Sequence, residues 1–148
     1  MSNSAQNLHD IAVARIAEML FTYPNGEFTP GLFHPSWITY TNVPKKQLPV
    51  PHHWMGELYP DIVIADKDRA NVPMIIAEVE TAEDLTLEGC LQSRWKPDKD
   101  ECGVLYTFVP EGYAAAAARL VVSYKFVFPT AIWTYGVNEK GEVRITPC

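Results

Sequence analysis

The sequence predicts an α/β domain in which a mixed β-sheet is flanked by α-helices. Helical and strand-like patterns alternate along the chain, and two neighbouring strand-like segments, near 58–65 and 74–81, are apolar at most positions. Strands that are apolar on both faces are typical of a sheet covered on both sides. The chain has 148 residues, of which 47% are hydrophobic, so it can bury a substantial core. We expect a single domain over residues 1–148.

The first half of the chain is expected to form a helix, a strand and a hairpin. The helix has apolar residues at helical spacing, namely Leu8, Ala12, Ile16, Met19 and Leu20. Turn-forming residues at 23–26 end it. Three prolines and two histidines after the first strand indicate a long connection, the kind of segment that often carries function. The expected elements are a helix at 4–20, a loop at 31–35, a strand at 36–43, a connection at 44–54 and a hairpin at 58–81.

The second half is expected to alternate helices with strands. Pro97 should end the helix that follows the hairpin, and Pro110 should begin the next one. The run Ala114–Ala118 would allow that second helix to pack closely on a sheet. The expected elements are a helix from 84 or 86 to 96, a strand at 103–109, a helix at 110–125, a strand at 131–137, a turn at 138–141 and a short strand at 142–146.

Three acids in the predicted hairpin are the most informative residues of the chain. Asp61 begins one apolar strand, and Glu78 and Glu80 end the other. A buried carboxylate is costly unless it meets a cation, hydrogen-bond donors or a proton. If Ala65 pairs with Met74, Asp61 lies directly opposite Glu78, although a slip of one residue would break this arrangement. Residues two apart on a strand share a face, so Glu78 and Glu80 should point the same way.

This pattern resembles the PD-(D/E)XK nuclease superfamily. Pro60 and Asp61 match the first half of its motif, and Glu78-Val79-Glu80 matches the second half with one change, because Glu80 stands where the family usually has lysine. The order of the expected elements, over roughly residues 5 to 125, is also similar to that family. The resemblance implies a restriction-endonuclease-like core and metal-dependent cleavage of phosphodiester bonds.

The resemblance further implies a set of site residues. Asp61, Glu78 and the carbonyl of Val79 would bind Mg²⁺ or Mn²⁺, and Glu80 would bind a second metal ion or act as general base. Gln92, on the helix after the hairpin, would reach toward the same centre. An alternative remains open, in which the acids are solvated or form ion pairs with Arg94 or Lys96.

Three further residues near the motif have competing interpretations. Lys96 could replace the missing motif lysine in space, or it could be an ordinary charge at the end of a helix. Glu18 could be an extra acid of the site, but its position opposite the apolar stripe favours a surface pair with Arg15. Trp95 lies on the apolar stripe of its helix and is expected in the core.

The four histidines give little support for a separate metal site. His52 and His53 are adjacent, so on a strand they would face opposite ways, and no ligand spacing joins them to His34. His9 is expected to be an ordinary helix residue.

Charge and composition limit the range of functions. The net charge is −6 and the pI is about 5.1, which argues against binding nucleic acid through bulk charge but leaves local basic patches. No apolar run approaches the ~18 residues that span a bilayer. Three cysteines without a CxxC pair or a signal-like N-terminus predict reduced thiols and a cytoplasmic location without membrane attachment.

Two function hypotheses follow. The first is a metal-dependent endonuclease that hydrolyses nucleic acid, DNA in the first place, as a homodimer that reaches both strands. The second is a nuclease-like fold that no longer cuts and serves as a binding or assembly module. The missing motif lysine and the acidic pI favour the second hypothesis.

Overall fold

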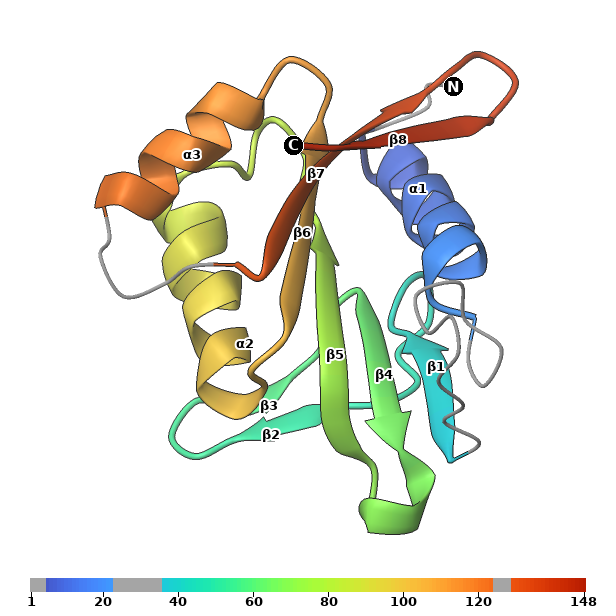
Figure 1. Ribbon diagram of the computed structural model, residues 1–148, viewed down its shortest axis with the longest axis vertical. Coiled ribbons are helices and arrows are strands. Elements are labelled where there is room, and N and C mark those ends of the chain that lie inside the picture. The colour runs from blue at the N-terminus through green and yellow to red at the C-terminus, as the bar shows by residue number, and fades with distance from the viewer. Residues whose placement is uncertain (1–4, 23–35, 124–128) are drawn as a thin grey trace.

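The computed structural model describes residues 5–22, 36–123 and 129–148, and it has a mixed α/β architecture (Figure 1). Its helices are α1 (Ala5–Leu20), the short 3₁₀ turn η1 (Lys67–Arg69), the π-helix η2 (Leu87–Trp95), α2 (Lys96–Glu101) and α3 (Ala114–Ser123). Its strands are β1 (Trp37–Thr41), β2 (Val50–His52), β3 (Gly56–Leu58), β4 (Ile62–Asp66), β5 (Val72–Val79), β6 (Leu105–Pro110), β7 (Ala131–Val137) and β8 (Val143–Pro147).

Six strands form one curled mixed sheet in the order β1-β4-β5-β6-β7-β8. β5, β6 and β7 run parallel, and the outer pairs are antiparallel. In Figure 1, α1 lies on one side of this sheet, and α2 and α3 lie on the other. The described residues therefore confirm the predicted mixed sheet flanked by helices.

Helix α1 buries a face that differs slightly from the predicted stripe. Its fully or nearly buried apolar residues are Ala12, Val13, Ile16 and Ala17, whereas Leu8 is 36% exposed. The predicted stripe was therefore rotated toward Leu8, because leucine is more hydrophobic than the alanines that make the real contact. His9 lies on the true inner face, at the i−3 and i−4 positions from Ala12 and Val13. The predicted helix stop at 23–26 and loop at 31–35 fall outside the described residues.

The hairpin of β4 and β5 has the register that matters for the acids. Ile62 pairs with Ala77, and the same register continued by one residue places Asp61 opposite Glu78. Alternate residues of β5, including Ala77, pack into the apolar cluster under α1, so the acidic side chains belong to the opposite face. The predicted opposition of Asp61 and Glu78 is confirmed.

The register differs at the turn end of the same hairpin. The predicted pairing of Ala65 with Met74 is wrong, because Ala65 pairs with Pro73 after an irregularity between Ile64 and Ala65. A β-bulge of this kind places one extra residue on one strand and shifts the pairing beyond it. The predicted register is still correct for the acids, because the shift lies between Ile64 and the turn, away from the end of the hairpin that carries Asp61 and Glu78.

The helix after the hairpin continues past its predicted end. Residues Leu87–Trp95 form a π-helix, and α2 follows without a break through Glu101, so the prediction that Pro97 ends the helix is wrong. Pro97 lies at the junction where the π-helical pattern of η2 gives way to α2, and the helix continues across it. Trp95 is fully buried, as predicted. The continuation buries Asp98, which is only 1% exposed.

Two other boundaries also differ from the sequence interpretation. Pro110 ends β6, and α3 begins only at Ala114, because Gly112 adopts a positive φ of 90° that turns the chain between them. The predicted end of this helix near residue 125 lies outside the described residues. Within α3, Ala117 is fully buried, in line with the close packing expected of the alanine run.

A small two-stranded ribbon, β2–β3, spans the end of the predicted connection and the residues that follow it, and the sequence did not indicate it. His52 joins this ribbon to α2. Its Nδ1 accepts from the backbone N–H groups of Trp54 (3.3 Å) and Met55 (3.1 Å), and its Nε2 contacts Asp100 at 2.9 Å. Because Nδ1 accepts, the proton must lie on Nε2, which then donates to Asp100.

Asn42 holds the segment that leads into Asp61. Its Nδ2 donates to the carbonyl oxygens of Leu48 (2.9 Å) and Pro60 (2.7 Å), and its Oδ1 accepts the N–H groups of Gln47 and Leu48. Its backbone N–H donates to the carbonyl of Asp61 at 3.1 Å. Asn42, which is only 3% exposed, thus ties residues 47 and 48 to the segment that precedes β4.

We expect Asn42→Ala to lower the free energy of unfolding by about 2–4 kcal/mol, because it leaves several buried backbone groups without partners. Urea denaturation would measure the loss. Asn42→Asp is the matched test, since it keeps the acceptor but loses both donors, and it should be nearly as destabilising. A loss below about 0.5 kcal/mol in both variants would show that water replaces the amide.

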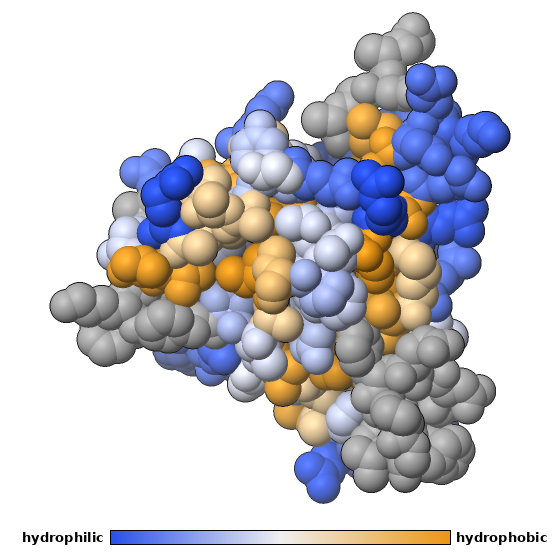
Figure 2. All heavy atoms as spheres, turned by 45° about the horizontal axis from the view of Figure 1, so that its top comes forward, coloured by the Kyte–Doolittle hydropathy of each residue, from blue (hydrophilic) through white to orange (hydrophobic). Residues whose placement is uncertain are grey.

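Apolar side chains reach the surface in several separate groups among hydrophilic ones (Figure 2). Val122 and Trp54 are among the large apolar residues most exposed, at 76% and 65%. Scattered exposure of this kind is ordinary in globular proteins, so it does not test the predicted homodimer. None of the helices in the described ranges has the length and apolar character that a bilayer crossing requires.

Candidate functional site

The candidate site lies at the end of the sheet where β4 begins and β5 ends. The backbone N–H of Asp61 donates to Oε1 of Glu78 at 3.3 Å, and Oδ2 of Asp61 accepts the N–H of Val79 at 2.8 Å. Both acids are nearly buried, at 8% and 2% exposed. The antiparallel pairing thus locks the two carboxyl groups to each other's strands.

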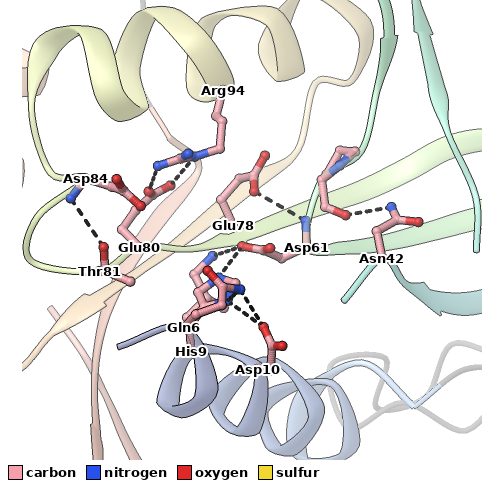
Figure 3. A network of polar contacts seen from close by, with 12 residues as sticks. Gln6, His9, Asp10, Asn42, Asp61, Glu78, Glu80, Thr81, Asp84 and Arg94 are labelled. Carbon is pink, nitrogen blue, oxygen red and sulfur yellow. Dashed lines mark hydrogen bonds and ion pairs between the residues drawn. The ribbon is translucent and has the colours of Figure 1, made fainter. Parts of the chain in front are cut away.

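His9 of α1 contacts Asp61 from one side of the sheet, as Figure 3 shows. Its Nε2 lies 3.2 Å from Oδ2 of Asp61, and its Nδ1 lies 3.1 Å from Oδ1 of Asp10. Burial alone would lower the pKa of His9, but the hydrogen bonds and charges of Asp61 and Asp10 outweigh burial and raise this pKa to about 9. The two carboxylates thus favour the imidazolium form of His9, in which both ring nitrogens can donate.

Glu78 has an acid rather than a cation as its close neighbour. Burial raises the pKa of Glu78 well above its usual value, and the charge of Asp98 and a hydrogen bond to it raise this pKa further. Burial also raises the pKa of Asp98 to about 7, although the hydrogen bond from Glu78 opposes the rise. Within the described residues, Oδ2 of Asp98 has no hydrogen-bond partner. At neutral pH this pair holds a proton that a cation could replace.

Glu80 is held differently, by a cation and by neutral donors. Arg94 donates from Nε to Oε2 of Glu80 at 3.2 Å and from Nη2 to Oε1, and the indole N–H of Trp95 donates to Oε2 at 3.0 Å. The hydroxyl of Tyr135 donates to the Glu80 carbonyl at 2.6 Å. Burial raises the pKa of Glu80, while Arg94 and Trp95 oppose that rise. The carboxylate of Glu80 is thus fully paired, as the ion-pair alternative anticipated.

A cavity of about 240 Å³ opens beside these groups. Figure 3 shows α1 approaching from one side and the helix that carries Arg94 from the other. The side chains of Asp61, Glu78, His9 and Arg94 all reach this cavity. The residues that line it are Gln6, His9, Val43, Tyr59, Asp61, Glu78, Val79, Thr81, Asp84 and Arg94.

The remaining predicted site residues lie elsewhere. Gln92 is exposed on η2 and does not line the cavity. The ammonium group of Lys96 lies 3.3 Å from Asp100, so it does not replace the motif lysine. Glu18 is exposed and lies 3.7 Å from Arg15, in agreement with the predicted surface pair.

The adjacent histidines do not make a convincing metal site. His52, His53 and Glu101 bring one ligand atom each within 4.8 Å of one another. However, a metal on Nε2 of His52 would require a proton on Nδ1, where two backbone N–H groups already donate. The contacts of His52 therefore fit a structural link between the ribbon and α2. His34 lies outside the described residues.

Sequence reasoning missed two residues of the site and named a third in only one of its roles. His9 was treated as an ordinary helix residue, although its position at i−3 and i−4 from Ala12 and Val13 could have placed it on the buried face. Asp98 lies beyond the predicted end of its helix at Pro97, so no pattern could place it. Arg94 was considered only as an ion-pair partner, whereas it also lines the cavity.

The donor set fits a hard divalent cation at two of the three predicted acids. Among the described residues, Oδ1 of Asp61 accepts no hydrogen bond, and Glu78 lacks a cationic partner. Carboxylate oxygens of this kind are the ligands that Mg²⁺ and Mn²⁺ prefer. Glu80 does not fit, because both of its oxygens accept hydrogen bonds from Arg94 and Trp95. Comparison with family models, with curated proteins and with solved structures finds no match to this chain.

Proposed function

We propose that this protein is a metal-dependent phosphodiester hydrolase that acts on nucleic acid, with DNA as its first candidate substrate. The observation that carries this proposal is the pairing of Asp61 with Glu78 beside a cavity, without a cation for Glu78. Glu78, a buried acid whose hydrogen-bonding neighbour is another acid, Asp98, lies beside the carboxylate of Asp61, and close carboxylates of this kind are typical ligands of a divalent cation.

The chain's own residues have separable roles in this proposal. Asp61 and Glu78 would hold Mg²⁺ or Mn²⁺, with the Val79 carbonyl as the further ligand that the motif resemblance implies. His9 and the Val79 N–H orient the Asp61 carboxylate through its Oδ2, and Oδ1 accepts no hydrogen bond from the described residues. A bound divalent ion would neutralise phosphate charge and lower the pKa of water. The overall reaction adds water to phosphorus and breaks one P–O ester bond.

Two further features agree with the family resemblance. The expected order of elements is present as α1, β1, the β4–β5 hairpin, η2 with α2, β6 and α3. In addition, the acids lie where β5 ends, and the ends of parallel strands are common ligand sites in open α/β sheets. Both features agree with the resemblance to PD-(D/E)XK nucleases, which supplies the choice of a phosphodiester.

A specific observation favours the second candidate function, a nuclease-like module that does not cut. Glu80, at the position where the family has lysine, is fully paired with Arg94 and Trp95 and offers neither a ligand nor a base. In such a module the site would still be acidic and buried, but it would not need a metal ion.

We expect wild-type protein, freed of metal with a chelator, to bind Mn²⁺ and to melt at a higher temperature in its presence. At a free concentration of 100 times Kd, binding adds about 2.7 kcal/mol to the free energy of unfolding. Asp61→Asn and Glu78→Gln should lose this response, and Glu18→Gln, a surface acid, should keep it. Calorimetric titration and thermal melting would measure both effects.

The same samples would separate the two functions. Incubation with single-stranded, duplex and branched DNA and with RNA should show cleavage by wild type that requires Mn²⁺. Binding of Mn²⁺ without cleavage of any of these would favour the non-cutting module. Absence of any Mn²⁺ response in the wild type would remove the hydrolase proposal.

A further inference from the structure

The guanidinium of Arg94 is held along one edge only. Its Nε and Nη2 donate to the two oxygens of Glu80, while the side chain lines the same cavity as Asp61 and Glu78. A guanidinium has five N–H donors in a rigid plane. Two of them serve Glu80, and within the described ranges Nη1 makes no hydrogen bond. The edge of the guanidinium that carries Nε and Nη2 is therefore fixed by Glu80, and the edge that carries Nη1 is open.

Glu80 is an unusually rigid anchor for this guanidinium. Its side chain is completely buried, its second oxygen also accepts the Trp95 indole N–H, and its backbone is bonded on both sides. The N–H of Glu80 donates to the carbonyl of Phe108 at 2.8 Å, and its carbonyl accepts the Tyr135 hydroxyl. Arg94, by contrast, keeps 32% of its side chain exposed. The pair thus places a partly exposed planar donor at a fixed point of the cavity wall.

The other cations near the cavity are already engaged. Both ring nitrogens of His9 contact carboxylates, those of Asp61 and Asp10. Lys96, the next basic residue of the same helical segment, lies against Asp100 and does not line the cavity. Of the described residues that line the cavity, Arg94 is the cation with donors left for a ligand.

We propose that the open edge of Arg94 binds the phosphate of the substrate, and that Glu80 is the positioning residue that holds the guanidinium there. This inference rests on the proposed function and names the residue that would hold its phosphodiester. A planar guanidinium can donate to two phosphate oxygens at once, and this geometry suits a phosphate better than the single ammonium group of lysine. Glu80 would thus serve the site through Arg94, rather than as a metal ligand or a base.

The negative charge of the acids in the site also affects phosphate binding at Arg94. Asp61 and Glu78 repel a phosphate unless a divalent cation neutralises them. Phosphate binding at Arg94 should therefore require the cation, whereas cation binding should not require Arg94. This asymmetry gives the experiment two independent readouts.

The test uses a pair of variants that keeps the buried charge balanced. Glu80→Gln with Arg94→Gln removes the ion pair without leaving a lone buried charge. Glu111→Gln with Arg144→Gln is the matched control, because Arg144 also uses Nε and Nη2 to bind Glu111, at 2.8 Å for each contact, but on the surface. Arg94→Lys keeps a cation beside Glu80 and loses only the planar set of N–H donors that can bind two oxygens at once.

Binding of a labelled DNA oligonucleotide would be measured by fluorescence anisotropy with Ca²⁺ present, and a gel would check that the DNA stays intact. We expect the Glu80–Arg94 double variant to bind DNA about 10- to 100-fold more weakly. The slope of the logarithm of its DNA affinity against the logarithm of salt concentration should become shallower, by the amount that corresponds to about one phosphate contact. Arg94→Lys should lose affinity while keeping the slope, and Glu80→Gln should weaken binding by loosening Arg94. Mn²⁺ affinity by calorimetry should stay unchanged in all of them.

The outcomes separate the two proposals. Unchanged DNA affinity and salt slope in the Glu80–Arg94 double variant, with normal Mn²⁺ binding, would overturn this inference and leave the proposed function standing. Equal losses in the Glu111–Arg144 control would also overturn it, because the effect would then be general to surface charge. A wild type that binds neither Mn²⁺ nor DNA would overturn both.

Discussion

Arg94→Gln alone is expected to lower the free energy of unfolding by about 3–5 kcal/mol at pH 7. The substitution leaves the carboxylate of Glu80 completely buried without its cation, and breaking a buried pair in this way costs more than removing the pair. The Trp95 N–H remains as a partner for Glu80 but cannot neutralise its charge. Urea denaturation followed by tryptophan fluorescence would measure the loss.

The double variant with Glu80→Gln should recover most of that stability, because no unpaired charge remains and the Trp95 N–H still has an acceptor. Arg144→Gln, which breaks the exposed pair with Glu111, should change stability little. If the double variant were as unstable as Arg94→Gln, the loss would come from the packing of the guanidinium rather than from the charge of Glu80.

The second large effect is a fall in stability of the metal-free protein as the pH rises from about 4 to 7. Burial raises the pKa of Asp98 from its ordinary 3.8 to about 7, and that of its partner Glu78 also rises. The folded state therefore binds more protons than the unfolded chain over this range. Because the unfolded state binds fewer protons, the free energy of unfolding decreases with increasing pH. A rise of three pKa units corresponds to roughly 4 kcal/mol.

Urea titrations between pH 4 and 8 in the presence of a chelator would show this slope. Glu78→Gln should make it shallower, because it removes one of the two buried acids whose pKa is raised in the folded state, while burial of Asp98 remains. His9 has a separate window, since its raised pKa contributes stability that is present below its unfolded value and is lost as the pH passes about 9. Stability that rises with pH between 4 and 7 in wild type would mean that the two acids do not share a proton.

The fold was predictable where local patterns and tertiary structure agree. The alternation of helices and strands, the acidic hairpin and the opposition of Asp61 to Glu78 follow from apolar spacing and strand geometry. The β2–β3 ribbon was missed because three-residue strands leave no periodic signal. Proline gave misleading boundaries at Pro97 and Pro110, since its effect depends on whether the position needs its N–H.

The candidate site was only half predictable for a different reason. Sequence shows which residues lie on a strand, so Asp61 and Glu78 could be paired. It does not show which helix face meets the end of the sheet, and this arrangement brings in His9, Arg94 and Asp98. The partner of Glu80 decides whether that acid is a free ligand. The sequence offered both Arg94 and Lys96 as partners, and tertiary packing selects Arg94.

The irregularity between Ile64 and Ala65 divides the hairpin into two segments with separate registers. The segment near the sheet end carries Asp61 and Glu78, and the other carries the turn around η1. A gain or loss of one residue in the turn can be absorbed by moving or removing the extra residue at the bulge, before it reaches the acids. The turn can therefore change in length by one residue without changing the register that places Asp61 opposite Glu78.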